Sequence, residues 1–305
     1  MPLEDHLLTE ARNPASEAID TLDAAGIVAL MHAEDEKAVA AVGAERAAIA
    51  HVVALAAERF RAGGRLIYLG AGTSGRLGVL DAAECPPTFS TPPSLVVGRI
   101  AGGEAALTRA VEGAEDDPQA GADDVRDLNV GPNDLVVGIA TSGRTPYVLG
   151  ALREARVRGA TTVGLACNRP SLLEDVADHM ITPLVGPEVI AGSTRLKSGT
   201  ATKLVLNTIT TGAMVLIGKT FGNRMIDLMP TNEKLRIRTR RILRELAGLD
   251  DATATDTLRQ CGGRLKPALV MAFTGVGIDE AEGRLAEHGG QVRQAVRAVT
   301  GKDPR

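Results

Sequence analysis

The chain contains no tryptophan, and aromatic residues make up only 2% of its 305 residues. No apolar run reaches the roughly 18 residues that a membrane-spanning helix needs, so we expect no membrane partner. The net charge is −4 and no basic block is interleaved with aromatic residues, which argues against nucleic acid as a partner. The first residues are polar and acidic, unlike a signal peptide, so we expect a cytoplasmic protein.

Cysteine is also scarce. Cys85, Cys167 and Cys261 are odd in number and far apart, which is typical of reduced thiols rather than of a disulfide framework. None of the three has the spacing of a metal ligand. The sequence therefore indicates neither disulfides nor a cysteine metal site.

Alternating apolar runs and helical segments dominate the middle of the chain. Strands are predicted at 65–69, 94–98, 134–140, 161–166 and 180–184, with helices near 75–84, 103–115, 146–158 and 171–178. Such βα alternation predicts a three-layer α-β-α fold around a parallel sheet. Because alanine and glycine are abundant, we expect close helix packing.

Three parts are expected along the chain. Residues 1–62 read as helices that cover the sheet or a partner subunit, and residues 63–242 hold the sheet. Residues 243–305 are rich in glycine breaks and read as a small subdomain of three helices.

The predicted strand at 65–69 leads into the turn Gly70-Ala-Gly-Thr-Ser-Gly75, and a helix follows. Free backbone N–H groups at a helix start favour a phosphate, and Gly72, Thr73 and Ser74 are candidates for binding it. The glycine spacing also matches the dinucleotide fingerprint, which requires a ribose-binding carboxylate about 20 residues later. The segment 94–100 offers none, which argues against a nicotinamide site.

A second hydroxyl-rich turn, Thr141-Ser-Gly-Arg-Thr145, follows the predicted strand at 134–140. Ligands bind beyond the carboxyl ends of parallel strands, so the two turns can converge on one phosphorylated sugar. Ser142, Gly143 and Thr145 are the candidates here. The polar loop at 188–200 adds Ser193, Thr194 and Lys197 as possible donors, with Lys197 a plausible anion partner.

Two carboxylates have unusual positions. Glu84 is expected to end the helix of the first turn, because Cys85-Pro86-Pro87 should stop it, and Glu115 is expected to end the helix at 104–114. A carboxylate at a helix C-terminus meets the negative end of the helix dipole, which costs up to about 1 kcal/mol. Such placement points to a functional role for both residues.

The stretch from Gly70 to Pro87 resembles the signature of the N-acetylmuramic acid 6-phosphate etherases, which have the sugar isomerase (SIS) fold. The likeness extends through residues 9–14, 141–145, 192–200 and 223–228. It implies a flavodoxin-like sheet, a homodimer, no metal and no cofactor, and a last segment similar to a ubiquitin-associated module. The family's proton donor falls on Glu84, and its second catalytic acid falls on Glu115.

The resemblance further implies a carbon–oxygen lyase of amino-sugar recycling. Water would cleave the D-lactyl ether of N-acetylmuramic acid 6-phosphate into N-acetylglucosamine 6-phosphate and D-lactate. We expect Glu115 to act as the base and Glu84 as the acid. An aldose–ketose isomerase and a non-catalytic sugar-phosphate sensor remain as alternatives, although an isomerase needs no acid that protonates an ether.

Overall fold

The computed structural model describes residues 7–227 and 233–304. These residues divide into two compact units. The sheet unit comprises the chain up to Glu84 together with Pro93–Thr211. The helical unit comprises Cys85–Pro92 together with the residues from Gly212 on. Every site residue predicted from the sequence lies in the sheet unit.

The sheet unit is built on five parallel strands in the order β2-β1-β3-β4-β5. The strand order is that of a flavodoxin-like sheet. All five strands were predicted, and β1 and β3 are buried along their whole length because both faces of the sheet are covered there. The strands are β1 (Leu66–Gly70), β2 (Val96–Ile100), β3 (Leu135–Ile139), β4 (Thr161–Leu165) and β5 (His179–Ile181).

Helices α5 (Pro118–Asp127) and α6 (Pro146–Val157) cover one face of the sheet. Two glycines allow them to approach each other closely. A Cβ added at Gly121 would lie 2.0 Å from the carbonyl oxygen of Tyr147, and one at Gly150 would lie 1.9 Å from that of Pro118. The expected close helix packing is confirmed at this contact.

The opposite face carries α3 (Gly72–Phe89) and α7 (Lys197–Leu216). The Tyr68 hydroxyl of β1 donates to Asp81 on α3 over 3.0 Å, and Thr210 on α7 donates to the same carboxylate over 3.2 Å. Burial raises the pKa of Asp81, and these two hydrogen bonds act in the opposite direction. With helices on both faces, the predicted three-layer arrangement is confirmed.

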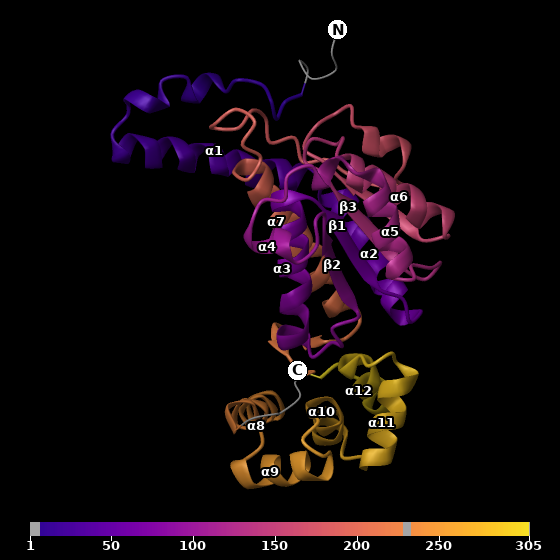
Figure 1. The fold of residues 1–305 in the computed structure, drawn as a ribbon. Coiled ribbons are helices and arrows are strands. Elements are labelled where there is room, and N and C mark those ends of the chain that lie inside the picture. Colours follow the sequence, from indigo (N-terminus) through magenta and orange to yellow (C-terminus); the bar gives the residue numbers. More distant parts are fainter. Residues whose placement is uncertain (1–6, 228–232, 305) are drawn as a thin grey trace. The chain divides into compact units, whose positions relative to one another are not determined.

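The N-terminal part forms α1 (Ala24–Ala44) and α2 (Arg46–Arg61). Helix α2 contacts β1, β3 and β5, so this part covers the sheet as predicted. Helix α1 extends away from the strands (Figure 1), and Val28 and Val39 on it are exposed, as is Leu22 just before it. Across the described residues no single helix is long and apolar enough to span a membrane, although α1 and α2 taken together, with a 62° bend, satisfy length and composition.

Three helix predictions are wrong in detail. Helix α3 does not stop at the prolines but runs through Pro86 and Pro87 to Phe89, so Glu84 lies inside the helix. Proline lacks an N–H, yet its φ is helical, and the N–H of Ser90 bonds to the carbonyl of Pro86 beyond them. The predicted helix at 103–115 consists of the short α4 (Ala105–Thr108) and a 3₁₀ turn at Ala114–Asp116, and the segment at 171–178 forms only a 3₁₀ turn, Leu172–Asp175.

The helical unit packs around α10 (Leu265–Thr274), which contacts every other helix of this unit. These helices are α8 (Glu233–Ala247), α9 (Asp251–Gln260), α11 (Ile278–Glu287) and α12 (Val292–Thr300), and a small hairpin joins β6 (Thr220–Phe221) to β7 (Arg224–Met225). The predicted boundary at 242–243 falls inside α8, and four helices rather than three follow it. Glycines with positive φ at 262–263, 275 and 289–290 separate these four helices.

Candidate functional site

The two hydroxyl-rich turns leave neighbouring strands at the same end of the sheet. Strands β1 and β3 are parallel and adjacent, and their last residues, Gly70 and Ile139, are paired. The first turn opens α3 and the second opens α6. The expectation that both turns lie at one edge of the sheet is confirmed, and it follows from the strand order.

The glycines of the first turn allow close packing of α3 on the sheet. A Cβ at Gly75 would lie 2.5 Å from the carbonyl oxygen of Gly70 and 2.6 Å from Cγ1 of Ile100. Gly72 has φ +53°, which favours glycine. Thr73 is half-buried and Ser74 is buried. The fingerprint spacing therefore has a packing reason in this chain that requires no dinucleotide.

The second turn is held by residues that the sequence did not single out. Gly143 has φ +76°, and its carbonyl accepts from the Ser171 hydroxyl over 3.2 Å. The Asn168 amide donates to the carbonyl of Thr141 over 2.9 Å and to the hydroxyl of Thr9 over 3.0 Å. Asn168 thus ties the N-terminal segment to the turn. The resemblance of residues 9–14 to the etherases was the only sequence signal of this link. The candidates Ser142 and Thr145 are half-buried.

The third polar loop reaches the first turn. A Cβ at Gly199, in the first turn of α7, would lie 3.5 Å from Cγ2 of Thr73 and 3.6 Å from the carbonyl oxygen of Thr194. Ser193 and Thr194 are half-buried beside this contact. The structure therefore brings the loop carrying Ser193 and Thr194 next to Thr73.

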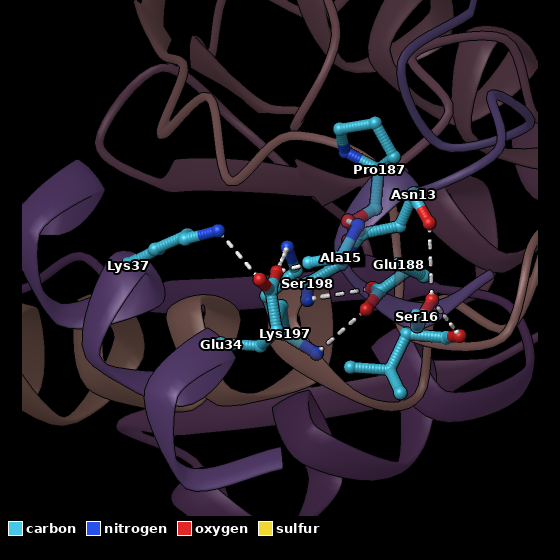
Figure 2. Close-up of polar contacts among 10 residues, drawn as sticks. Asn13, Ala15, Ser16, Glu34, Lys37, Pro187, Glu188, Lys197 and Ser198 are labelled. Carbon is cyan, nitrogen blue, oxygen red and sulfur yellow. Dashed lines mark hydrogen bonds and ion pairs between the residues drawn. The ribbon is translucent and has the colours of Figure 1, made fainter. Parts of the chain in front are cut away.

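The start of α7 is already capped by a protein carboxylate. Glu188 is fully buried and accepts hydrogen bonds from the backbone N–H groups of Lys197 and Ser198, each over 2.9 Å (Figure 2). A carboxylate at this position also complements the positive end of the helix dipole. These two N–H groups are satisfied by Glu188 and do not serve a ligand.

Lys197 was predicted to bind an anion of the substrate, but in the structure its charge is paired within the protein. Its side chain is 1% exposed, and its Nζ lies 2.5 Å from Glu34 on α1, which is 2% exposed (Figure 2). Burial alone would raise the pKa of Glu34, but hydrogen bonds from Lys197, Lys37 and Asn13 lower it to about 2. Lys197 thus neutralises a buried carboxylate of the protein, and no feature of the local sequence around Glu34 had indicated this partner.

One pocket at this end of the sheet contains two of the predicted residues. It has a volume of 260 Å³ and lies between the start of α3 and the segment 106–115. Gly72 and Glu115 both line it, and Glu115 is exposed on the 3₁₀ turn. The structure thus places the helix start of the first turn beside one of the two predicted catalytic carboxylates.

Glu84 is not among the residues that line this pocket. It is exposed on α3, twelve positions after Gly72, and a helix rise of 1.5 Å per residue places it about 18 Å further along the axis. Within one chain, the two predicted carboxylates are therefore not brought to the same pocket. The expectation that both act on one sugar came from the resemblance to the etherases and from the need of the reaction for an acid and a base.

Two arginines line the pocket and were not predicted. Arg76 on α3 donates to the carbonyl oxygen of Leu107 over 3.1 Å and to that of Arg109 over 3.3 Å. Arg109 itself is exposed and lines the same pocket. The lining therefore combines two guanidinium groups with the carboxylates of Glu112 and Glu115. Among residues 7–227 and 233–304, no group of His, Cys, Asp and Glu side chains is arranged to hold a metal ion.

Comparison with known proteins identifies both the fold and the family. The glucokinase regulatory protein N-terminal SIS domain matches residues 48–156, and the SIS domain matches residues 117–211. The N-acetylmuramic acid 6-phosphate etherase of Rhodopirellula baltica is 54% identical over 94% of this chain and 95% of its own length. Those of Aliivibrio fischeri (strain MJ11) and Cutibacterium acnes are 50% and 52% identical, over 95% and 94% of this chain and 97% and 95% of their own. Identity at this level over nearly the whole chain shows that the chain belongs to the N-acetylmuramic acid 6-phosphate etherase family.

Proposed function

We propose that this protein cleaves the D-lactyl ether of N-acetylmuramic acid 6-phosphate with water, giving N-acetylglucosamine 6-phosphate and D-lactate. The observation that carries the proposal is the near full-length identity to relatives named for this activity. The pocket between α3 and segment 106–115 supports it, because it combines a helix start, cationic side chains and a carboxylate in one place. The protein would act as a carbon–oxygen lyase in amino-sugar recycling in the cytoplasm.

Glu115 is proposed as the base. In the open-chain sugar the C1 aldehyde acidifies the C2 proton, and a carboxylate at the pocket wall can remove it. The electron pair forms the C2–C3 double bond as the C3–oxygen bond breaks. Water then adds at C3 and a proton returns to C2, so the overall reaction consumes one water. General acid–base catalysis of this kind contributes about 10²- to 10⁴-fold.

Glu84 is proposed as the acid that protonates the departing lactyl oxygen. It does not line the pocket, and it stands about 18 Å along α3 from Gly72 and about 12 Å from Arg76, which does. We therefore propose that the protein acts as a homodimer in which Glu84 of one copy meets the pocket of the other. Its exposure on α3 leaves the carboxyl accessible to a second copy.

Helix α1 supports association as well. Val28 is 67% exposed and Val39 is 59% exposed, although both are large apolar residues. The eleven positions between them are close to three helical turns, so both valines lie on the same face of α1. The sequence predicted that residues 1–62 cover either the sheet or a partner subunit. Helix α2 covers the sheet, and we propose that α1 contacts the partner. Residues 63–242 would then carry the chemistry, and 243–305 would contribute packing or dimer contacts.

The activity is tested by incubating the purified protein with N-acetylmuramic acid 6-phosphate in H₂¹⁸O and measuring D-lactate. We expect lactate together with ¹⁸O in the C3 hydroxyl of the product, because water adds at C3 after elimination. Sugar binding without lactate would favour the sensor instead, and formation of a ketose would favour the isomerase.

The shared site is tested by mixing two inactive variants, Glu84→Gln and Glu115→Gln, after dissociation and reassembly. If each site draws one carboxylate from each copy, the mixture recovers about a quarter of the wild-type rate, because about half of the dimers are hybrids with one intact site of two. If both carboxylates of a site come from one chain, no hybrid has an intact site and the mixture stays inactive.

A further inference from the structure

Arg109 is a cation in the pocket lining whose charge no other part of the described chain uses. It is exposed on the segment that follows α4 and lines the 260 Å³ pocket with Gly72 and Glu115. Within residues 7–227 and 233–304, its guanidinium takes part in no ion pair or hydrogen bond. An exposed arginine without a partner in the protein can bind an anion through two parallel N–H hydrogen bonds.

The backbone that carries Arg109 is braced by a second arginine. The guanidinium of Arg76 donates to the carbonyl oxygens of Leu107 and Arg109, over 3.1 and 3.3 Å. Arg76 is half-buried and its hydrogen-bond partners in the described chain are backbone carbonyls, so its charge is not cancelled by a carboxylate there. The pocket lining thus contains Arg109, on a segment that Arg76 holds by hydrogen bonds, and Arg76 itself as a second cation.

We propose that Arg109 binds the carboxylate of the substrate's lactyl group and so distinguishes the ether substrate from its product. This inference rests on the proposed etherase function. The substrate carries two anionic groups, the phosphate at C6 and the lactyl carboxylate attached through the oxygen at C3. Glu115 lines the same pocket and is proposed to act at C2, next to C3. The hydroxyl-rich turns are the candidates for the phosphate at C6, so the lactyl carboxylate is the anion that remains for a cation in the pocket of this base.

The same contact assists departure of the leaving group. Lactate leaves with negative charge developing on the oxygen next to its carboxylate, and the two charges repel each other. A guanidinium bound to the carboxylate reduces this repulsion as the bond breaks. Glu112 and Glu115 line the pocket too, so Arg109 also offsets their repulsion of the lactyl carboxylate. N-acetylglucosamine 6-phosphate has the phosphate but no lactyl carboxylate, so Arg109 gives it no such contact.

The test compares substrate and product with the variants Arg109→Met and Arg109→Lys. A hydrogen-bonded charge pair of this kind contributes enough that Arg109→Met should lower kcat/KM for N-acetylmuramic acid 6-phosphate by about 10- to 100-fold. The affinity for N-acetylglucosamine 6-phosphate, measured as an inhibition constant, should stay within about twofold, because no contact to it is lost. Arg109→Lys should recover part of the loss, since it restores the charge without the bidentate geometry.

Arg153→Met is the matched control, because Arg153 is an exposed arginine on α6 that does not line the pocket. It should leave both constants unchanged. Equal weakening of substrate and product by Arg109→Met would assign the arginine to the phosphate and overturn the inference, and so would an unchanged kcat/KM. Failure of the etherase function itself is distinct, because the wild-type protein would then release no lactate.

Discussion

Replacing Lys197 by methionine removes one member of a buried ion pair and leaves the other in place. The Lys197 Nζ lies 2.5 Å from the Glu34 carboxylate, and the two side chains are 1% and 2% exposed. Breaking such a pair typically destabilises a protein by about 3–5 kcal/mol, because an uncompensated charge stays buried. The lowered pKa of Glu34, about 2 instead of 4.5, corresponds to about 3 kcal/mol in total. Because Lys37 and Asn13 still bond to Glu34, we expect a loss near 3 kcal/mol.

The loss is measured by urea unfolding followed by far-ultraviolet circular dichroism, since the chain has no tryptophan for fluorescence. The midpoint should fall while the slope m stays constant. Lys37→Met is the matched control: it removes a partner of the same carboxylate whose side chain is 57% exposed, and it should cost less than about 1 kcal/mol. The double variant Glu34→Leu/Lys197→Met should recover much of the loss, because it leaves no buried charge.

A different outcome would refute this reasoning. If Lys197→Met unfolded at the wild-type urea concentration but raised KM for N-acetylmuramic acid 6-phosphate, the ammonium would contact the substrate. The sequence-based assignment of Lys197 to anion binding would then be right, and the buried pair would not be what holds α1 to α7.

Three further predictions follow from the sheet unit. The pKa of Glu34 in the folded protein lies below its ordinary value, so the stability that its carboxylate contributes is present above about pH 4.5 and is lost towards pH 2. The difference in unfolding free energy between wild type and Glu34→Gln should close over that range. A difference unchanged at about pH 3 would contradict this reasoning. Gly121→Ala should lower the thermal midpoint by the equivalent of about 1–3 kcal/mol although alanine favours helix, because its Cβ meets the carbonyl of Tyr147; a stabilised variant would show that α5 and α6 separate at no cost. Asn168→Ala should speed amide hydrogen exchange of Thr9, whose N–H it accepts over 3.2 Å, and unchanged exchange would rule out the link.

The sequence by itself determined the sheet and the end at which the site lies. The runs Leu66–Gly70 and Leu135–Ile139 are apolar throughout because both faces of the sheet are covered, and such a run can be recognised from neighbouring residues alone. Once the strands are parallel, their carboxyl ends must meet at one edge, so the turns at Gly72–Ser74 and Ser142–Thr145 fall together. The family could also be read from the block between Gly70 and Pro87, which resembles the etherases residue by residue.

Only the tertiary structure decided which of the predicted residues can act together. Lys197 is paired with a carboxylate 163 positions away, and Glu84 continues a helix that its prolines were expected to end. Arg109 becomes a candidate only because the helix expected at 103–115 ends at Thr108, and the segment that follows lines the pocket. Neighbouring residues in the sequence indicate which segments are buried and where turns form. The partner of a charged side chain depends instead on which distant segments pack against it. Local patterns therefore fix where the elements are, and packing between them fixes which charges remain for a ligand.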